Sequence, residues 1–286
     1  MLDKEHFQSS FSGNGYYVIE NAFTYEEVAT MKNEADDILG FLLNSSIANN
    51  RLSQRVDLRS APDGQQTVRK VQPINDISHL FTKISGMDRI LDPLRLLMSD
   101  EPELMEEKMS YKQRLNRQLK HFKANKADDR FLIHNDWAYY RENGYPPTII
   151  TAAVCIDDCP IESGPLHIWP GTHLVNLPHD EVQIVRKSYQ IPDEHLHLYQ
   201  GIDLIVPAGS LVFFHGLLAH YSSYNLTQLP RRIIFFSYVP KKDSIGLDVR
   251  NAPMRKQEAH FEKIYLDASL SGRYIDQIKI TDTPVP

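Results

Sequence analysis

The chain has 286 residues, of which 42% are hydrophobic and 24% are charged, and its formal net charge is −6. This composition excludes a disordered, collagen-like or disulfide-stapled chain, and no apolar stretch is long enough for a transmembrane helix. The acidic balance argues against nucleic acid as a partner, because phosphate binding needs positive charge. The spacing of Cys155 and Cys159 fits neither a zinc ribbon nor a redox pair, so we expect a reducing, cytoplasmic setting.

The N-terminal part, to about residue 100, is predicted to be rich in helix. It contains one short strand, Tyr16–Ile19, which is aromatic and β-branched and follows a glycine turn. Thr24 and Glu27 then form a capping-box pattern, which predicts a helix that begins there and runs to about residue 43. A second helix is expected over Asp88–Met98.

After residue 103 the pattern changes to short apolar segments separated by Pro, Gly and Asn turns, which favours a sandwich or barrel over alternating strands and helices. A C-terminal helix is expected at about residues 254–266. Since no repeat or linker divides the chain, we predict one domain over residues 1–286. The strands expected are Met105–Lys112, Phe131–Asp136, Thr148–Ile156, Ile202–Val206, Ser210–Phe214 and Ile233–Val239.

The segment His134-Asn135-Asp136 places an imidazole and a carboxylate two residues apart. On a strand such residues point to the same face, where they can supply two ligands to one metal ion. The pattern alone is weak, because about one His-x-Asp is expected by chance in a chain with this many His and Asp residues. The alternative is an ordinary polar strand end, and a metal site needs a third ligand.

A second segment supplies that ligand. The strand around Leu211–Phe214 is followed by a turn and His220, and Arg231 begins another apolar strand eleven residues later. An arginine at the start of a buried strand needs an anionic partner. Two histidines and one carboxylate hold iron(II) on one face and leave positions open for a 2-oxo acid and dioxygen. The arginine would then bind the far carboxylate of that acid.

In their order along the chain, these elements resemble the phytanoyl-CoA dioxygenase family of iron(II)- and 2-oxoglutarate-dependent oxygenases. The resemblance extends from about residue 5 to residue 240 and implies a mainly β protein with outer helices around a double-stranded β-helix (jelly-roll, cupin-like) core, at about residues 103–240. The matching segments are Gly15–Phe23, His134–Asp136, Glu162–His173, Pro207–Gly216 and His220–Arg231.

The resemblance also implies roles for single residues. His134, Asp136 and His220 would be the catalytic iron(II) ligands, and Arg231 with Ser222 would bind 2-oxoglutarate. The family adds a lysine from the strand before the metal motif. Lys112 is our assignment and Lys123 the competing one. The implied reaction consumes dioxygen and 2-oxoglutarate, releases succinate and carbon dioxide, and hydroxylates an unactivated C–H bond. Because Asp136 is present, halogenation is disfavoured.

Candidate substrate contacts lie in three places, and each of these residues could instead be a packing residue. They are Arg69, Gln72 and Asn75 before the second helix, Trp137 and Tyr139 after the metal motif, and His167 in the Glu162–His173 segment. The segment from Tyr111 to Arg130 contains seven Lys or Arg residues. It is either a solvated face or a lid that attracts an anion. We therefore expect a small, anionic substrate and no membrane partner.

Three alternatives remain at this stage. The same cofactors could support desaturation, cyclisation or an acyl-CoA substrate. The jelly-roll could bind a small molecule without catalysis. A cupin-type metal dioxygenase without 2-oxoglutarate is disfavoured by Arg231, for which it has no use. The sequence does not decide the oligomeric state.

Overall fold

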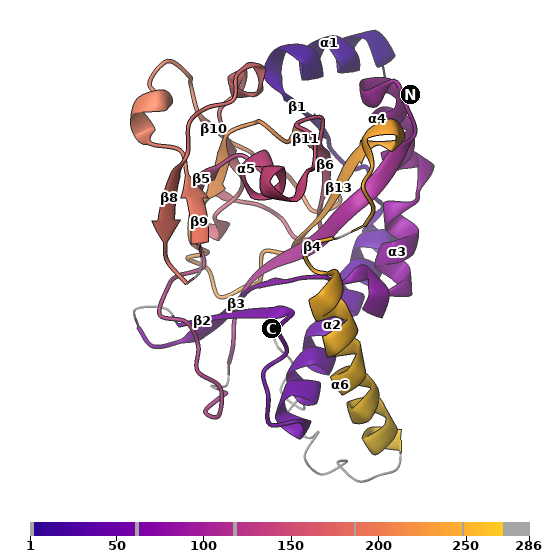
Figure 1. Ribbon diagram of the computed structural model, residues 1–286, viewed down its shortest axis with the longest axis vertical. Helices are drawn as coiled ribbons and strands as arrows, with labels where there is room; N and C mark the ends of the chain where they lie inside the picture. The colour runs from indigo at the N-terminus through magenta and orange to yellow at the C-terminus, as the bar shows by residue number, and fades with distance from the viewer. Residues whose placement is uncertain (1–2, 61–62, 117–118, 186, 248, 271–286) are drawn as a thin grey trace.

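The computed structural model describes residues 3–60, 63–116, 119–185, 187–247 and 249–270. Two facing sheets form the β-rich half of the molecule (Figure 1). In its spatial order, the larger sheet consists of β1 Tyr16–Ile19, β11 Leu211–His215, β6 Ile150–Cys155, β13 Ile233–Pro240, β4 Pro102–Arg114, β3 Gln66–Val71 and β2 Val56–Ser60. The smaller sheet consists of β10 Ile202–Asp203, β7 His167–Ile168, β12 His220–Ser222 and β5 Phe131–His134.

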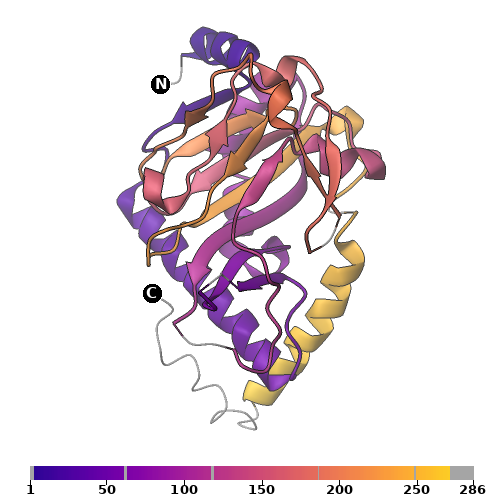
Figure 2. The ribbon, with the colours of Figure 1, turned by 90° about the vertical axis from the view of Figure 1, so that its left-hand side faces the viewer.

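The remaining strands, β8 Asp180–Gln183 and β9 Lys187–Gln190, form a separate hairpin. Helix α1 lies at one end of the molecule, whereas α2 and α6 extend from the sheets to the opposite end (Figures 1 and 2). None of the helices in the described ranges has the length and hydropathy needed to cross a membrane. The helices are α1 Lys4–Asn14, α2 Tyr25–Ala48, α3 His79–Ser85, α4 Asp88–Met98, α5 Trp137–Tyr140 and α6 Ala252–Leu270, with short 3-10 helices at Asn75–Ile77, Arg141–Asn143, Ile161–Ser163, Thr172–Leu174, Asp193–His195 and Lys241–Asp243.

Strand β13, in the middle of the larger sheet, packs into an apolar core on each of its faces. Ile233 and Phe235 point into the core between the two sheets, and Ile234 and Phe236 point into a second core under the helices. Because side chains alternate along a strand, a strand covered on both faces reads as a continuous apolar run. The first core forms one side of the site described below.

The expected jelly-roll and most of the expected elements are confirmed. Tyr16–Ile19 and Asp88–Met98 have the predicted bounds, and Thr24 and Glu27 form both hydrogen bonds of the capping box. The helix predicted to end at about residue 43 continues to Ala48, and two further expectations were wrong in detail. The strand predicted over Ile202–Val206 is only the two-residue β10, and the strand predicted to reach Asp136 ends at His134. Helix α1, strands β2 and β3, α3 and the β8–β9 hairpin were not predicted.

Candidate active site

The three expected metal ligands lie together. His134 ends β5 and His220 begins β12, and the two residues are direct partners across these antiparallel strands. Asp136 follows β5 and begins the turn into α5, where Asn135 caps the turn by accepting a hydrogen bond from the backbone of Ala138 at 3.0 Å. All three ligand residues are buried, and one ligand atom from each lies within 4.8 Å of the others.

Backbone hydrogen bonds orient both imidazoles. The Nδ1 atom of His134 lies 2.6 Å from the carbonyl of Leu132, and that of His220 lies 2.9 Å from the carbonyl of Leu218. Since a carbonyl only accepts, each Nδ1 carries the proton and each Nε2 offers a lone pair. The two Nε2 atoms lie 3.8 Å and 3.9 Å from Oδ1 of Asp136. The three donors therefore converge on one point.

The charges suit a divalent cation. Burial alone would raise the pKa of Asp136, but Lys108 and the two imidazoles outweigh it and hold this pKa at about 2. Burial lowers the pKa of His134 to about 3 and also lowers the pKa of His220. Near neutral pH the carboxyl group is thus ionised and both imidazoles are neutral, which is the protonation state that metal binding requires.

A small cavity of about 40 Å³ lies beside the triad. Arg231 lines it, is 1% exposed, and lies with Nη2 3.5 Å from the hydroxyl of Ser222. Among the described residues, Nε and Nη1 of Arg231 and the hydroxyl of Ser110 have no hydrogen-bond partner. Burial lowers the pKa of Arg231, and a buried guanidinium without an anion is costly. These groups fit the distal carboxylate of 2-oxoglutarate.

The two candidate lysines have different surroundings. Lys112 is fully buried, and its Nζ donates to the carbonyl of Ser223. Burial and the neighbouring Arg231 lower the pKa of Lys112 well below its usual value. Lys123 is exposed, and neither Lys112 nor Lys123 lines either cavity beside the triad. The structure therefore brings Lys112, not Lys123, close to Arg231.

The sequence interpretation missed Lys108. Its Nζ lies 3.5 Å from Oδ1 of Asp136, and it lines both the small cavity and the larger one described next. The signal was available, because Lys108 and Ser110 alternate with Lys112 along β4 and so share one face of the strand. Thr151, which donates to Oδ2 of Asp136 at 3.3 Å, was also missed.

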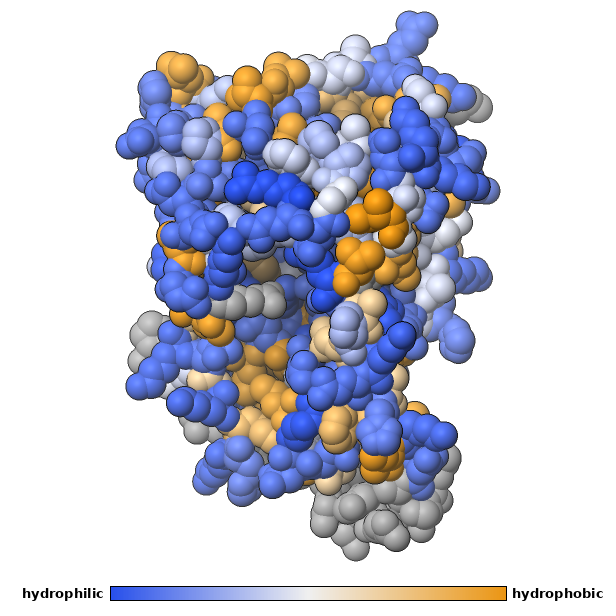
Figure 3. All heavy atoms as spheres, viewed as in Figure 1, coloured by the Kyte–Doolittle hydropathy of each residue, from blue (hydrophilic) through white to orange (hydrophobic). Residues whose placement is uncertain are grey.

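A larger cavity of about 550 Å³ opens onto the triad. Figure 3 shows hydrophilic side chains around a hollow near the middle of this face of the molecule. Arg69, Gln72 and Tyr139, three of the expected substrate contacts, line the cavity. Among the described residues, its lining contains seven Arg or Lys side chains and four Asp or Glu side chains.

The other expected substrate contacts pack elsewhere. The Nε1 atom of Trp137 donates to the carbonyl of Tyr145 at 3.0 Å within a small apolar cluster. Asn75 donates from its backbone to Glu107 at 3.1 Å and from its side chain to Ser85 at 3.3 Å. His167 pairs with Asp203 at 2.9 Å.

The residues of the basic segment, Tyr111 to Arg130, fit neither a solvated face nor an anion-attracting lid as a whole. Lys120, Lys123 and Lys126 are exposed, as a solvated face predicts, and Arg130 at the end of the segment lines the larger cavity. Arg114 pairs with Asp63 at 3.3 Å, and Arg117 lies outside the described residues.

A jelly-roll that carries a His-Asp-His triad next to a buried arginine with two nitrogens unpaired in the described ranges is the arrangement of an iron(II)- and 2-oxoglutarate-dependent oxygenase. Comparison of the sequence with known families agrees: the model of the phytanoyl-CoA dioxygenase (PhyH) family matches residues 11–233. The chain belongs to this family. The expected enzyme class, with iron(II), 2-oxoglutarate and dioxygen, is thereby confirmed.

Individual relatives are distant. The ectoine dioxygenase of Sphingopyxis alaskensis is 24% identical over 245 residues, which are 80% of this chain and 74% of the relative. The crystal structure of EctD from S. alaskensis with 2-oxoglutarate and 5-hydroxyectoine has a TM-score of 0.63 at 21% identity and covers 86% of this chain and 78% of that chain. The epimerase SnoN in complex with Fe³⁺, alpha ketoglutarate and nogalamycin RO has a TM-score of 0.62 at 19% identity, covering 83% of each chain. These structures share the fold of this chain.

Proposed function

We propose that this oxygenase hydroxylates an unactivated C–H bond of a small, anionic metabolite. The observation that carries the proposal is the cationic excess in the lining of the 550 Å³ cavity that opens onto the triad. A volume of this size is typical of a pocket for a small molecule. Positive groups around a cleft attract anions even when the whole protein is acidic.

The excess of positively charged side chains is concentrated on the wall of the larger cavity that β2 and β3 form. Arg59 and Arg69 both pair with the single carboxylate of Asp57, at 2.6 Å and 2.7 Å, and Lys70 follows Arg69 in the chain. Against the effect of burial, the two arginines hold the pKa of Asp57 well below its usual value. Of these four charged residues three are cations and one is an anion, so positively charged side chains predominate on this wall.

Each group at the site then has a role in the reaction. Iron(II), dioxygen and 2-oxoglutarate would supply the oxidising chemistry when bound, with one oxygen atom of dioxygen entering succinate as carbon dioxide leaves and the other entering the C–H bond of the substrate. His134, Asp136 and His220 hold the metal on one face, and Arg231 with Ser222 and Ser110 holds the distal carboxylate of the co-substrate. Phe214 and Phe235 line the small cavity and exclude water from it. The wall around Arg69 and Lys70 orients the substrate so that one C–H bond faces the metal.

The first test is an anaerobic absorbance titration of metal-free protein with iron(II) and then 2-oxoglutarate. We expect a visible charge-transfer band, which reports the oxo acid bound to iron through two atoms. Parallel titration of Arg231→Ala should need much more 2-oxoglutarate for the same band. A band of equal affinity in the variant would contradict the assignment of Arg231.

The second test is a screen for succinate release with small carboxylates and phosphonates, each paired with its uncharged amide or ester. Ectoine belongs in the panel because relatives are named for it. We expect the anionic member of a pair to stimulate turnover and the neutral member to fail; the reverse preference would contradict an anionic substrate. Product mass separates hydroxylation, which adds one oxygen atom, from desaturation, which removes two hydrogen atoms.

We also propose a cytoplasmic location. Cys155 and Cys159 are both free and buried, as expected in a reducing compartment. Fractionation of the source cells followed by immunoblotting tests this proposal, and recovery outside the cytoplasmic fraction would contradict it.

A further inference from the structure

Arg250, which follows the jelly-roll core, lines the larger cavity of about 550 Å³. It lies outside residues 11–233, the part of the chain that the family model matches. It forms an ion pair with Glu106 and donates from Nη1 to the carbonyl of Tyr139 at 3.3 Å. Its guanidinium also lies 4.3 Å from the centre of the Tyr140 ring. These contacts fix the guanidinium in the cavity wall.

Glu106 needs this partner. The side chain belongs to β4 and is 2% exposed. Besides Arg250, it accepts hydrogen bonds from Gln72 at 2.7 Å and from the hydroxyl of Tyr140. Those donors are neutral, and a buried carboxylate without a compensating cation is strongly unfavourable. Of the two cations that the structure describes near Glu106, Arg250 is the closer one.

The second cation near Glu106 is Lys108, which also faces the metal site. Its Nζ lies 3.6 Å from Oε2 of Glu106 and 3.5 Å from Oδ1 of Asp136. Charges thus alternate along a line from Arg250 through Glu106 and Lys108 to Asp136. The ammonium is shared almost equally between a carboxylate of the cavity wall and a carboxylate that ligates the metal.

We propose that Arg250 is a positioning residue of the iron site. By pairing with Glu106, it leaves the ammonium of Lys108 available to Asp136, and so limits the negative charge that this ligand presents to the metal. This inference concerns the metal site and does not depend on the identity of the substrate.

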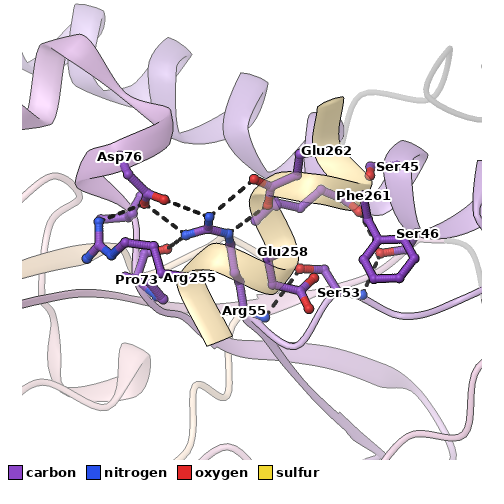
Figure 4. A network of polar contacts seen from close by, with 12 residues as sticks. Ser45, Ser46, Ser53, Arg55, Pro73, Asp76, Arg255, Glu258, Phe261 and Glu262 are labelled. Carbon is purple, nitrogen blue, oxygen red and sulfur yellow. Dashed lines mark hydrogen bonds and ion pairs between the residues drawn. The ribbon is translucent and has the colours of Figure 1, made fainter. Parts of the chain in front are cut away.

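Helix α6, which begins just after Arg250, is tied to the rest of the molecule by ion pairs around Arg55 and Asp76 (Figure 4). Arg55, whose side chain is 0% exposed, donates to Glu262 of α6 at 2.7 Å and to Asp76 at 2.7 Å. Arg255, in the first turns of α6, pairs with Asp76 at 2.9 Å and with Glu107 at 2.5 Å. Because Glu106 and Glu107 are consecutive on β4, arginines of one short segment pair with carboxylates on both faces of that strand. The backbone next to Arg250 is thereby fastened to the sheet.

The test compares the two partners of one ion pair, Arg250→Met and Glu106→Gln. Anaerobic titrations measure the dissociation constant of iron(II) and the wavelength of the charge-transfer band with 2-oxoglutarate. Removing Arg250 should draw Lys108 toward Glu106 and leave Asp136 more electron-donating. We expect iron(II) to bind roughly three- to tenfold more tightly and the band to move to longer wavelength.

Glu106→Gln should have the opposite effects, because Lys108 then pairs with Asp136 alone. Iron(II) should bind more weakly, and the band should move to shorter wavelength. The double variant should return both quantities toward those of the unsubstituted protein. The proposal predicts changes of opposite sign in iron(II) affinity for the two single variants. A general loosening of the site would instead weaken iron(II) binding in both, and that result would overturn the proposal.

Two controls complete the experiment. Arg250→Lys keeps the charge and should keep both the affinity and the band. Arg89→Met is the matched control, since Arg89 also pairs with a glutamate, Glu27 at 2.8 Å, and lies 4.7 Å from the centre of the Phe23 ring, but away from the cavity. It should change neither quantity. If Arg250→Met does not fold, the nearly isosteric Glu106→Gln variant still tests the predicted direction of the band shift. An unshifted band in Glu106→Gln would overturn the proposal.

Discussion

His134 and His220 lie directly opposite each other on β5 and β12, with ring centroids 4.4 Å apart. Each imidazole bonds through Nδ1 to the carbonyl two residues before it in the chain. The register of two strands and these two hydrogen bonds therefore set the spacing and orientation of the two nitrogen ligands. We expect the site to be preformed in metal-free protein.

The first prediction concerns the ligands themselves. His134→Ala and Asp136→Ala should each abolish turnover and weaken iron(II) binding by at least about tenfold, which is the loss found when even the outer partners of metal ligands are removed. Anaerobic calorimetry with iron(II) measures the affinity. His197→Ala, which removes an exposed imidazole, should bind iron(II) normally. Normal iron binding by either ligand variant would refute the assignment.

The second prediction uses two adjacent arginines. Arg231→Ala should raise the concentration of 2-oxoglutarate needed for half-maximal turnover at least about thirtyfold, since breaking a buried charge pair costs about 2–5 kcal/mol. Arg232→Ala is the control, because its guanidinium points away from the site, to Asp157 at 2.8 Å and Asp36 at 2.5 Å. It should lower the melting temperature and leave the 2-oxoglutarate requirement unchanged. Equal requirements in both variants would place the carboxylate contact elsewhere.

Local patterns in the sequence explain which parts of the fold were predictable. The cap at Thr24 and the apolar strands were found because capping and burial leave short-range signals. Strands β2 and β3 were missed because each contains only two apolar residues and carries charged ones, Asp57 and Arg59 in β2 and Arg69 and Lys70 in β3. Three of these charged residues, Arg59, Arg69 and Lys70, line the larger cavity, so the strands lack the apolar pattern by which a strand is recognised.

Some residues of the site could likewise be predicted from local sequence patterns, and others could not. The ligands and Arg231 could be predicted from the spacing of residue types within two short segments. The contact between Glu106 and Arg250 could not, because it joins residues far apart in the chain and neither lies in a motif. Lys108 lies between these cases. Strand periodicity places it on the face of Lys112, but only the three-dimensional register shows that it reaches Asp136.

The third prediction tests the wall of the larger cavity that β2 and β3 form. Arg69→Gln and Lys70→Gln should each raise the KM for an anionic substrate by about tenfold, while the affinity for iron(II) stays unchanged. Substituting Lys120 and Lys126 by Gln together should leave KM unchanged, because both are exposed and neither lines the cavity. Steady-state succinate release measures both. An effect from the exposed pair alone would favour a lid formed by the basic segment over the wall formed by β3.

The last prediction is the pH dependence of stability in metal-free protein. Burial lowers the pKa of His134 from 6.5 to about 3, and it lowers the pKa of His220 in the same direction. Below pH 6.5 the unfolded chain therefore binds protons at these residues that the folded protein does not bind, so the free energy of unfolding falls as the pH falls. The slope is at most about 1.4 kcal/mol per pH unit for each histidine.

Chemical denaturation of metal-free protein at several pH values between 7 and 4.5 measures this slope. His134→Gln removes one titrating group and should flatten it, whereas His197→Gln, at an exposed position, should not. Asp136 acts in the same direction but only in more acid solution, because its pKa is lowered from 3.8 to about 2 and its contribution is lost as the pH falls through that range. A slope that is the same in His134→Gln and in the unsubstituted protein would show that His134 is not held in its neutral form by burial.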